Sequence, residues 1–105
     1  MIKDIDFKKG KITYNDFNID SKIPFKNQEF SFKEDILQVN YPQGYLLDVG
    51  WYPEFNPKGK FTIYIIKNCD WSNPIAIKKT KSLETLKKIL LEFIDLISER
   101  LEQNL

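Results

Sequence analysis

The chain of 105 residues contains no histidine and only one cysteine, Cys69. The absence of histidine removes both the commonest general base and the commonest metal ligand of proteins. A single cysteine can form neither an intramolecular disulfide nor a thiolate metal cluster. A Cys/His or Ser/His/Asp mechanism is therefore excluded, and we expect no catalytic residues, no metal and no other cofactor.

The sequence also lacks an excess of charge of either sign, because it contains 16 basic and 15 acidic residues and its net charge is +1. Binding to nucleic acid usually needs a basic excess on one face, so nucleic acid is not an expected partner. The lysines at 8–11 and 78–81 fit the protection of sheet edges better than phosphate binding. No apolar run could cross a bilayer, and the first residues lack the features of a signal peptide. We therefore expect a cytoplasmic protein with no membrane partner.

The most strand-like part of the sequence lies between residues 45 and 67. Apolar residues alternate with others in YLLDVGWY (45–52) and in FTIYIIK (61–67), which predicts two strands with one apolar face each. The segment 53–60 between them contains two prolines and Gly59. This composition is typical of a loop, so the two strands are predicted to pair as a hairpin.

The pattern predicts further strands on both sides of this hairpin. Residues 2–7 and 12–14 flank a glycine-containing turn and indicate an opening hairpin. The alternation in 29–33 and 36–41 indicates another hairpin, and a short strand is expected at 75–77. Consecutive strands joined by short turns tend to be neighbours, which favours an antiparallel meander.

The C-terminal segment has the pattern of a helix that begins after Ser82, a residue suited to cap it. Its apolar residues recur at helical spacing, at positions 83, 86, 90, 93, 94, 97 and 101. A helix of this length is long enough to lie across a sheet of five or six strands. The predicted fold is α+β: one domain spanning residues 1–105, with an antiparallel meander of five to six strands packed on one face by a long C-terminal helix.

Four carboxylates recur along one side of this helix at spacings of three, four and three residues. They are Glu92, Asp95, Glu99 and Glu102. The like charges of such a stripe repel one another and lie toward the negative end of the helix dipole, so they slightly destabilise the helix. It would suit a basic partner, and replacing Asp95 and Glu99 together by lysine should then slow association. The alternative is that the stripe is the solvent face of an amphipathic helix.

Large aromatic residues gather near the ends of the predicted central strands. Trp51 shares the apolar face with Val49 and is expected in the core. Tyr52, Phe55 and Trp71 lie at a strand end or in loops, where aromatic side chains often anchor a partner. They are therefore predicted partner-binding residues, together with the acidic stripe. The alternative is that they close the core at the end of the sheet.

A different class of function would use the carboxylates of the same region. Asp48, Glu54 and Asp70 lie in or next to the central strands, and a trio near one sheet end could serve acid/base chemistry or hold a metal. The competing hypotheses are thus a small-molecule-binding or enzymatic domain that uses these carboxylates and tyrosines, and an adaptor subunit.

One combination of residues resembles a known family. It consists of Asp48-Val49-Gly50-Trp51-Tyr52-Pro53, then Asn56-Pro57 and Gly59 before Phe61, then Asn68, Asp70-Trp71 and Pro74 ahead of the final helix. This pattern resembles the small bacterial immunity proteins encoded beside polymorphic toxins, including those of contact-dependent growth inhibition systems. The resemblance implies a cytoplasmic, non-enzymatic protein that binds one toxin domain, often a nuclease, and blocks its active site or substrate surface. The near-neutral charge departs from the acidic balance expected of a nuclease inhibitor.

Overall fold

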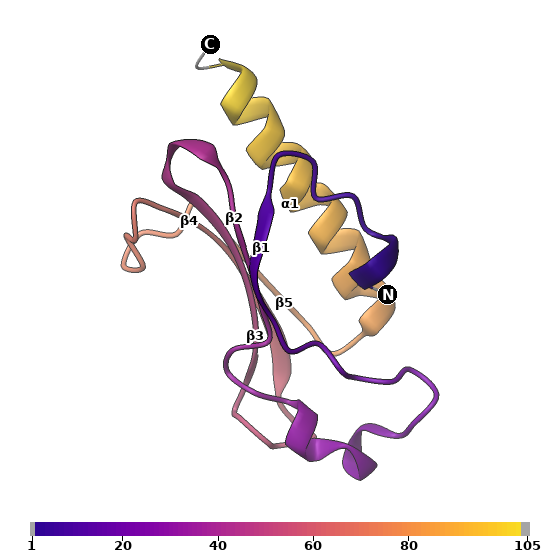
Figure 1. Cartoon of the computed structure of the whole chain (residues 1–105). Coiled ribbons are helices and arrows are strands. Elements are labelled where there is room, and N and C mark those ends of the chain that lie inside the picture. Colours follow the sequence, from indigo (N-terminus) through magenta and orange to yellow (C-terminus); the bar gives the residue numbers. More distant parts are fainter. Residues whose placement is uncertain (1, 104–105) are drawn as a thin grey trace.

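The computed structural model describes residues 2–103 and shows a five-stranded antiparallel sheet with one long helix (Figure 1). The strands follow one another across the sheet in chain order, so the prediction of an α+β fold with a meander is confirmed. The elements are β1 (Lys11–Asn15), β2 (Leu37–Asn40), β3 (Tyr45–Tyr52), β4 (Lys60–Lys67), β5 (Ala76–Thr80) and α1 (Leu83–Gln103). Short 3₁₀ turns occupy Ile2–Asp4, Phe25–Asn27, Glu29–Ser31 and Pro42–Gly44.

The hairpin of β3 and β4 forms the centre of the sheet, as the alternation predicted. Its register runs from Tyr45 opposite Lys67 to Tyr52 opposite Lys60, so every residue of the two strands is paired. The apolar face of this hairpin includes Trp51, which is fully buried, and this confirms the prediction that Trp51 belongs to the core. The prediction of a strand near 75–77 is also confirmed, because β5 pairs along β4.

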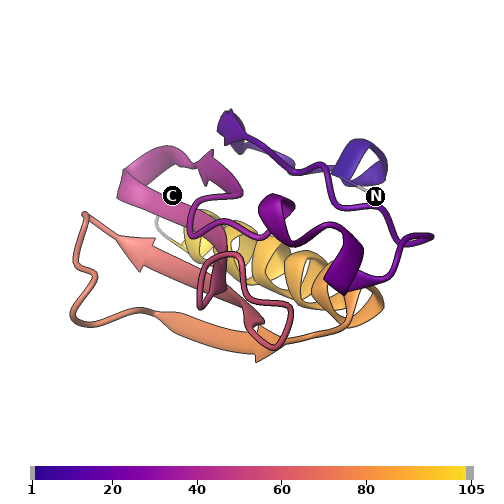
Figure 2. The ribbon, with the colours of Figure 1, turned by 90° about the horizontal axis from the view of Figure 1, so that it is seen from below.

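Helix α1 begins where the sequence indicated and covers the apolar face of the sheet (Figure 2). The Ser82 hydroxyl accepts a hydrogen bond from the Thr85 backbone N–H at 3.1 Å, which satisfies one of the free N–H groups of the first turn. The buried residues of the helix are Leu86, Ile89, Leu90, Phe93, Ile94, Ile97 and Leu101. They join the sheet residues in one hydrophobic core. No helix among residues 2–103 is long and apolar enough to cross a membrane.

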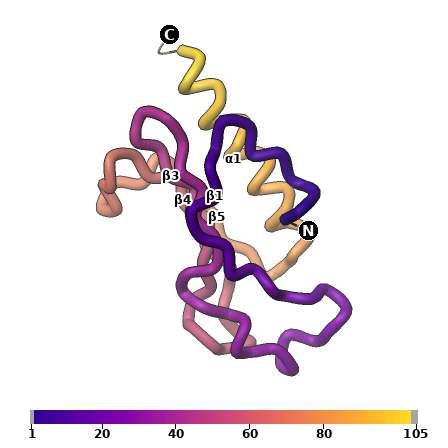
Figure 3. The backbone as a smooth tube through the Cα atoms, viewed as in Figure 1, coloured from indigo at the N-terminus to yellow at the C-terminus, as the bar shows by residue number. Residues whose placement is uncertain are grey.

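The predicted opening hairpin is wrong. Residues 2–7 form no strand; Ile2–Asp4 form a 3₁₀ turn, and the backbone of this segment runs beside α1 (Figure 3). Ile2, Ile5 and Phe7 are buried in the same core as the helix. Strand β1 pairs with β2 rather than with the N-terminal segment. The apolar residues of this segment contribute to the core without forming a strand.

The predicted strand at 29–33 is also wrong, although its alternation has a structural cause. Glu29–Ser31 forms a 3₁₀ turn, while Phe32 is fully buried and its ring stacks on Trp51 with centroids 4.2 Å apart. Phe25 and Phe61 also contact this pair edge-on or tilted. Aromatic packing therefore holds the segment, since ring pairs of this kind add stability beyond the area they bury.

Candidate functional site: the open face of the sheet

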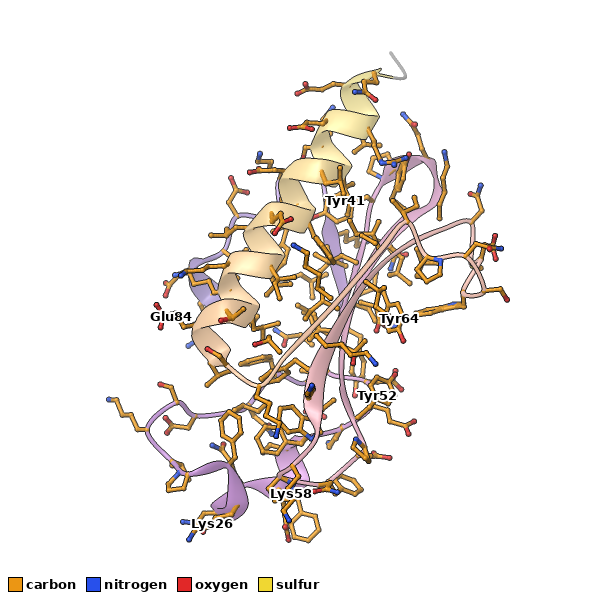
Figure 4. The ribbon with its side chains drawn as sticks, turned by 180° about the vertical axis from the view of Figure 1, so that it is seen from behind. Lys26, Tyr41, Tyr52, Lys58, Tyr64 and Glu84 are labelled. Carbon is orange, nitrogen blue, oxygen red and sulfur yellow. The ribbon has the colours of Figure 1, made fainter. Side chains whose placement is uncertain are left out.

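The two faces of the sheet differ sharply in what covers them. One face carries Leu47, Val49 and Ile63 into the core under α1. Within residues 2–103 no α-helix lies over the opposite face, which we call the open face. Figure 4 shows Tyr52 and Tyr64 on this side, away from α1. The middle of this face is covered, because Asp48, Thr62 and Ile66 are each at most 2% exposed. A solvent-facing sheet face is normally polar, so the partly exposed aromatic residues around this buried middle require an explanation.

A row of five directly paired residues crosses the open face from edge to edge. Tyr14 pairs with Gln38, Gln38 with Asp48, Asp48 with Tyr64, and Tyr64 with Ile77. We call these residues the central row. Directly paired residues point to the same face of a sheet and touch one another. Tyr14 and Ile77, at the two ends, are 41% and 47% exposed, so the row presents apolar surface at both sheet edges.

Asp48 lies in the middle of the central row and is only 2% exposed. Its Oδ2 atom accepts a hydrogen bond of 2.8 Å from the Gln38 side-chain amide. Burial raises the pKa of the Asp48 carboxyl; the hydrogen bond from Gln38 opposes this and the charge of Asp35 adds to it. The site therefore holds a carboxylate whose ionised form is disfavoured by its surroundings.

Tyr52 and the segment 33–36, which is hydrogen-bonded to β3, lie next to Gly50 beside this carboxylate. Gly50 lies beside Asp48, and a Cβ at Gly50 would meet the Glu34 carbonyl oxygen at 2.0 Å and the Tyr52 ring at 3.1 Å. The Glu34 backbone and the Tyr52 ring thus lie directly over Gly50. Burial raises the pKa of Tyr52 to about 12, with further contributions from Asp48, Tyr64, Glu34 and Asp35. Acidic and aromatic groups are therefore concentrated around Asp48.

The loop between β4 and β5 closes the other side. Trp71 lies edge-on to Tyr64 with ring centroids 5.5 Å apart, and 46% of Trp71 is exposed. The loop projects from the sheet away from α1 (Figure 1). Its base is fixed to the β2–β3 turn, because the Asn68 N–H donates to the Gly44 carbonyl at 2.9 Å. Trp71 therefore belongs to the open face.

The raised pKa of Asp48 gives a prediction for stability. Asp48 ionises in the unfolded state once the pH rises above about 4, but in the folded state it ionises only at a higher pH, because its pKa is raised there. The carboxyl group therefore lowers the free energy of unfolding increasingly above this pH, and the reduction is complete above the folded-state pKa. Asp48→Asn should therefore raise the unfolding free energy at pH 7 more than at pH 3, since asparagine can still accept the Gln38 bond. Urea unfolding at both pH values measures this difference. The exposed Glu99→Gln is the control; an equal effect of both variants would contradict the burial argument.

The predicted partner-binding residues do not form one surface. Tyr52 and Trp71 lie on the open face, whereas Glu92 and Asp95 lie on α1, which covers the opposite face. Two of the four helix carboxylates pair with the chain's own lysines: Lys8 Nζ lies 2.8 Å from Asp95 and Lys78 Nζ lies 2.9 Å from Glu92. Glu99 and Glu102 are exposed on the last turns. The acidic stripe is therefore partly neutralised within the protein.

The remaining predicted residues lie elsewhere. Phe55, in the β3–β4 loop, packs against Phe30 with centroids 5.8 Å apart. Glu54 lies in the same loop, while Asp70 lies in the β4–β5 loop at the opposite end of the hairpin, so the grouping of these two with Asp48 near one sheet end is wrong. No group of three or more metal-binding side chains occurs within residues 2–103. Cys69 is exposed.

The sequence reasoning missed four members of the central row, Tyr14, Gln38, Tyr64 and Ile77. Alternation alone could have placed Tyr64 on one face of β4 and Asp48 on one face of β3. It could not show that the two residues are directly opposite, because a shift in register by one residue reverses the face of a strand.

A concave region separate from the open face lies at the start of α1. It is a groove of about 590 Å³ between the segment 17–21 and the helix. Apolar side chains of Phe17, Ile19, Leu83 and Leu91 line it. Its charged side chains are mixed, because Lys87 and Lys88 are accompanied by Asp20 and Glu84.

Comparison of the chain with protein-family models, with curated protein sequences and with solved structures gave no match.

Proposed function

We propose that this protein is a non-enzymatic immunity protein that binds a cognate bacterial toxin domain and blocks the toxin's active site or substrate surface. The observation that supports this most directly is the open face, where partly exposed aromatic residues surround a buried carboxylate on a rigid sheet. Aromatic anchors on rigid elements are typical of protein-binding hot spots. The proposed place of action is the bacterial cytoplasm, and a nuclease domain is the partner class that the resemblance favours.

The residues that carry the family resemblance also contribute to this surface. Asp48 and Tyr52 come from the Asp48–Pro53 motif, and Trp71 comes from the Asp70-Trp71 pair. Gly50 of the same motif allows the Glu34 backbone to approach β3. The motif thus supplies side chains of the open face, which is the reason that we place the interface there rather than on α1.

The direct test is a calorimetric titration of the protein with the product of the gene immediately upstream, followed by a toxicity assay of the complex. We expect one-to-one binding with a nanomolar Kd, equivalent to about −12 kcal/mol, and loss of the partner's toxicity. Absence of binding would remove the support for an immunity function.

The location of the interface gives a separate prediction. Tyr52→Ala with Trp71→Ala should weaken binding by about 100-fold or more, since truncated hot-spot aromatics typically cost 2 kcal/mol or more each. Both residues are exposed, so the variant should fold. The matched control is Asp95→Lys with Glu99→Lys on α1. If the helix variant loses affinity and the aromatic variant does not, the acidic stripe is the interface.

The groove beside α1 supports a second candidate function, the binding of a small molecule. Its volume of about 590 Å³ falls in the range of ligand pockets, and its lining is largely apolar. A thermal-shift screen of metabolites tests this function. Stabilisation by a compound in the wild-type protein but not in Leu91→Glu would support it.

A further inference from the structure

Asp48 is a buried carboxylate without a cation. No lysine or arginine among residues 2–103 forms an ion pair with it. Lys60 and Lys79 share the open face through their pairing with Tyr52 and Thr62, yet neither neutralises Asp48. Buried carboxylates are normally paired, because an unpaired charge away from water is costly. Within residues 2–103, Asp48 therefore lacks the cation that would offset the cost of its ionised form.

One oxygen of this carboxylate has unused hydrogen-bonding capacity. Gln38 donates to Oδ2, whereas no side chain among residues 2–103 donates to Oδ1. An ionised carboxylate can accept several hydrogen bonds. A donor from outside the chain would therefore find an acceptor already held in place by Gln38 and by the paired strands on both sides.

The surroundings of Asp48 favour a flat cation over a compact one. Tyr64 lies directly opposite Asp48, Trp71 lies against Tyr64, and Tyr52 lies over Gly50 next to Asp48. Aromatic faces attract cations, and the planar guanidinium of arginine stacks on them better than the strongly hydrated ammonium of lysine. Tyr52 lies over Gly50 beside Asp48 and is 39% exposed, so a change of its rotamer opens the space next to the carboxylate.

We propose that the open face captures an arginine side chain of the partner, whose guanidinium donates to Asp48 Oδ1 and lies between the rings of Tyr52 and Tyr64. This proposal rests on the proposed function only for the source of the arginine, which is the bound toxin domain. Glu34 and Asp35, in the segment 33–36, add negative charge beside Tyr52 and Asp48 and favour the approach of a cation.

The test uses N-acetyl-arginine amide as the probe and its neutral analogue N-acetyl-citrulline amide as the ligand control. Backbone amide chemical shifts of the full-length, isotope-labelled protein are followed during titration with each compound. We expect the arginine compound to shift the amides of residues 48, 52 and 64 and to bind at least about fivefold more tightly than the citrulline compound. N-acetyl-lysine amide should fall between them.

Asp48→Asn should abolish the preference for arginine over citrulline, while Asp95→Asn on α1 should retain it. The amide spectra also show whether each variant remains folded. Equal responses to arginine and citrulline, or an arginine preference that persists in Asp48→Asn, would overturn the proposal.

The same variants separate this proposal from the proposed function. If the upstream gene product binds wild-type protein and Asp48→Asn equally, the immunity function stands and the arginine site is wrong. If the arginine compound binds at Asp48 but the gene product does not bind at all, the arginine site stands and that partner is wrong.

Discussion

Replacement of Trp51 by alanine is expected to lower the free energy of unfolding by about 3–5 kcal/mol, the largest stability effect of any single change considered for this protein. Trp51 is fully buried, stacks on Phe32 and contacts Phe61 edge-on at 4.8 Å. Its indole N–H also donates to the Asn56 carbonyl at 2.7 Å, which fixes the β3–β4 loop. The variant would lose ring packing and leave that carbonyl without its partner.

Urea unfolding followed by circular dichroism measures this effect. The chain offers a matched control in its other tryptophan, because Trp71 is 46% exposed and contacts only Tyr64 among the described aromatic rings. Trp71→Ala should cost less than about 1.5 kcal/mol, the upper range for one aromatic pair. If the two substitutions destabilise the protein equally, Trp51 is not the centre of the aromatic core.

The second large effect is expected from Gly50→Ala, which should destabilise the protein by about 2–4 kcal/mol. The new Cβ would lie 2.0 Å from the Glu34 carbonyl oxygen, a distance that forces the two backbones apart. The separation would strain the backbone hydrogen bonds on both sides of Gly50. In these bonds the Trp51 N–H donates to the Lys33 carbonyl at 2.8 Å, and the Ile36 N–H donates to the Val49 carbonyl at 3.0 Å. Overpacking costs about 1–3 kcal/mol and each lost hydrogen bond about 1 kcal/mol.

Equilibrium unfolding of Gly50→Ala, with Asp35→Ala as control, measures this effect. Asp35 is exposed in the same segment, so its truncation removes a charge without touching the backbone and should change stability by less than about 0.5 kcal/mol. A fully stable Gly50→Ala would show that the segment 33–36 can leave β3 at little cost. The same variant should also displace the Tyr52 ring, which lies 3.1 Å from the new Cβ.

The elements that the sequence predicted correctly are those with strong local signals. Alternation identified β3 and β4, and helical spacing with Ser82 as the cap identified α1. The segments 2–7 and 29–33 also alternate, but they contain 3₁₀ turns and no strand. Ile2, Ile5, Phe7 and Phe32 are buried, whereas Phe30 is 74% exposed. A short alternating pattern therefore does not distinguish a strand from an irregular segment, and it does not fix which of its apolar side chains are buried.

The sequence by itself determined the fold class, the exclusion of histidine- and disulfide-based chemistry, and the burial of Trp51. These follow from composition and from periods of two and of 3.6 residues, which are local properties. The open face was decided by the tertiary structure alone. Register placed Asp48 between Gln38 and Tyr64, and the β4–β5 loop brought Trp71 against Tyr64. Such contacts join residues distant in the chain, so no local pattern encodes them.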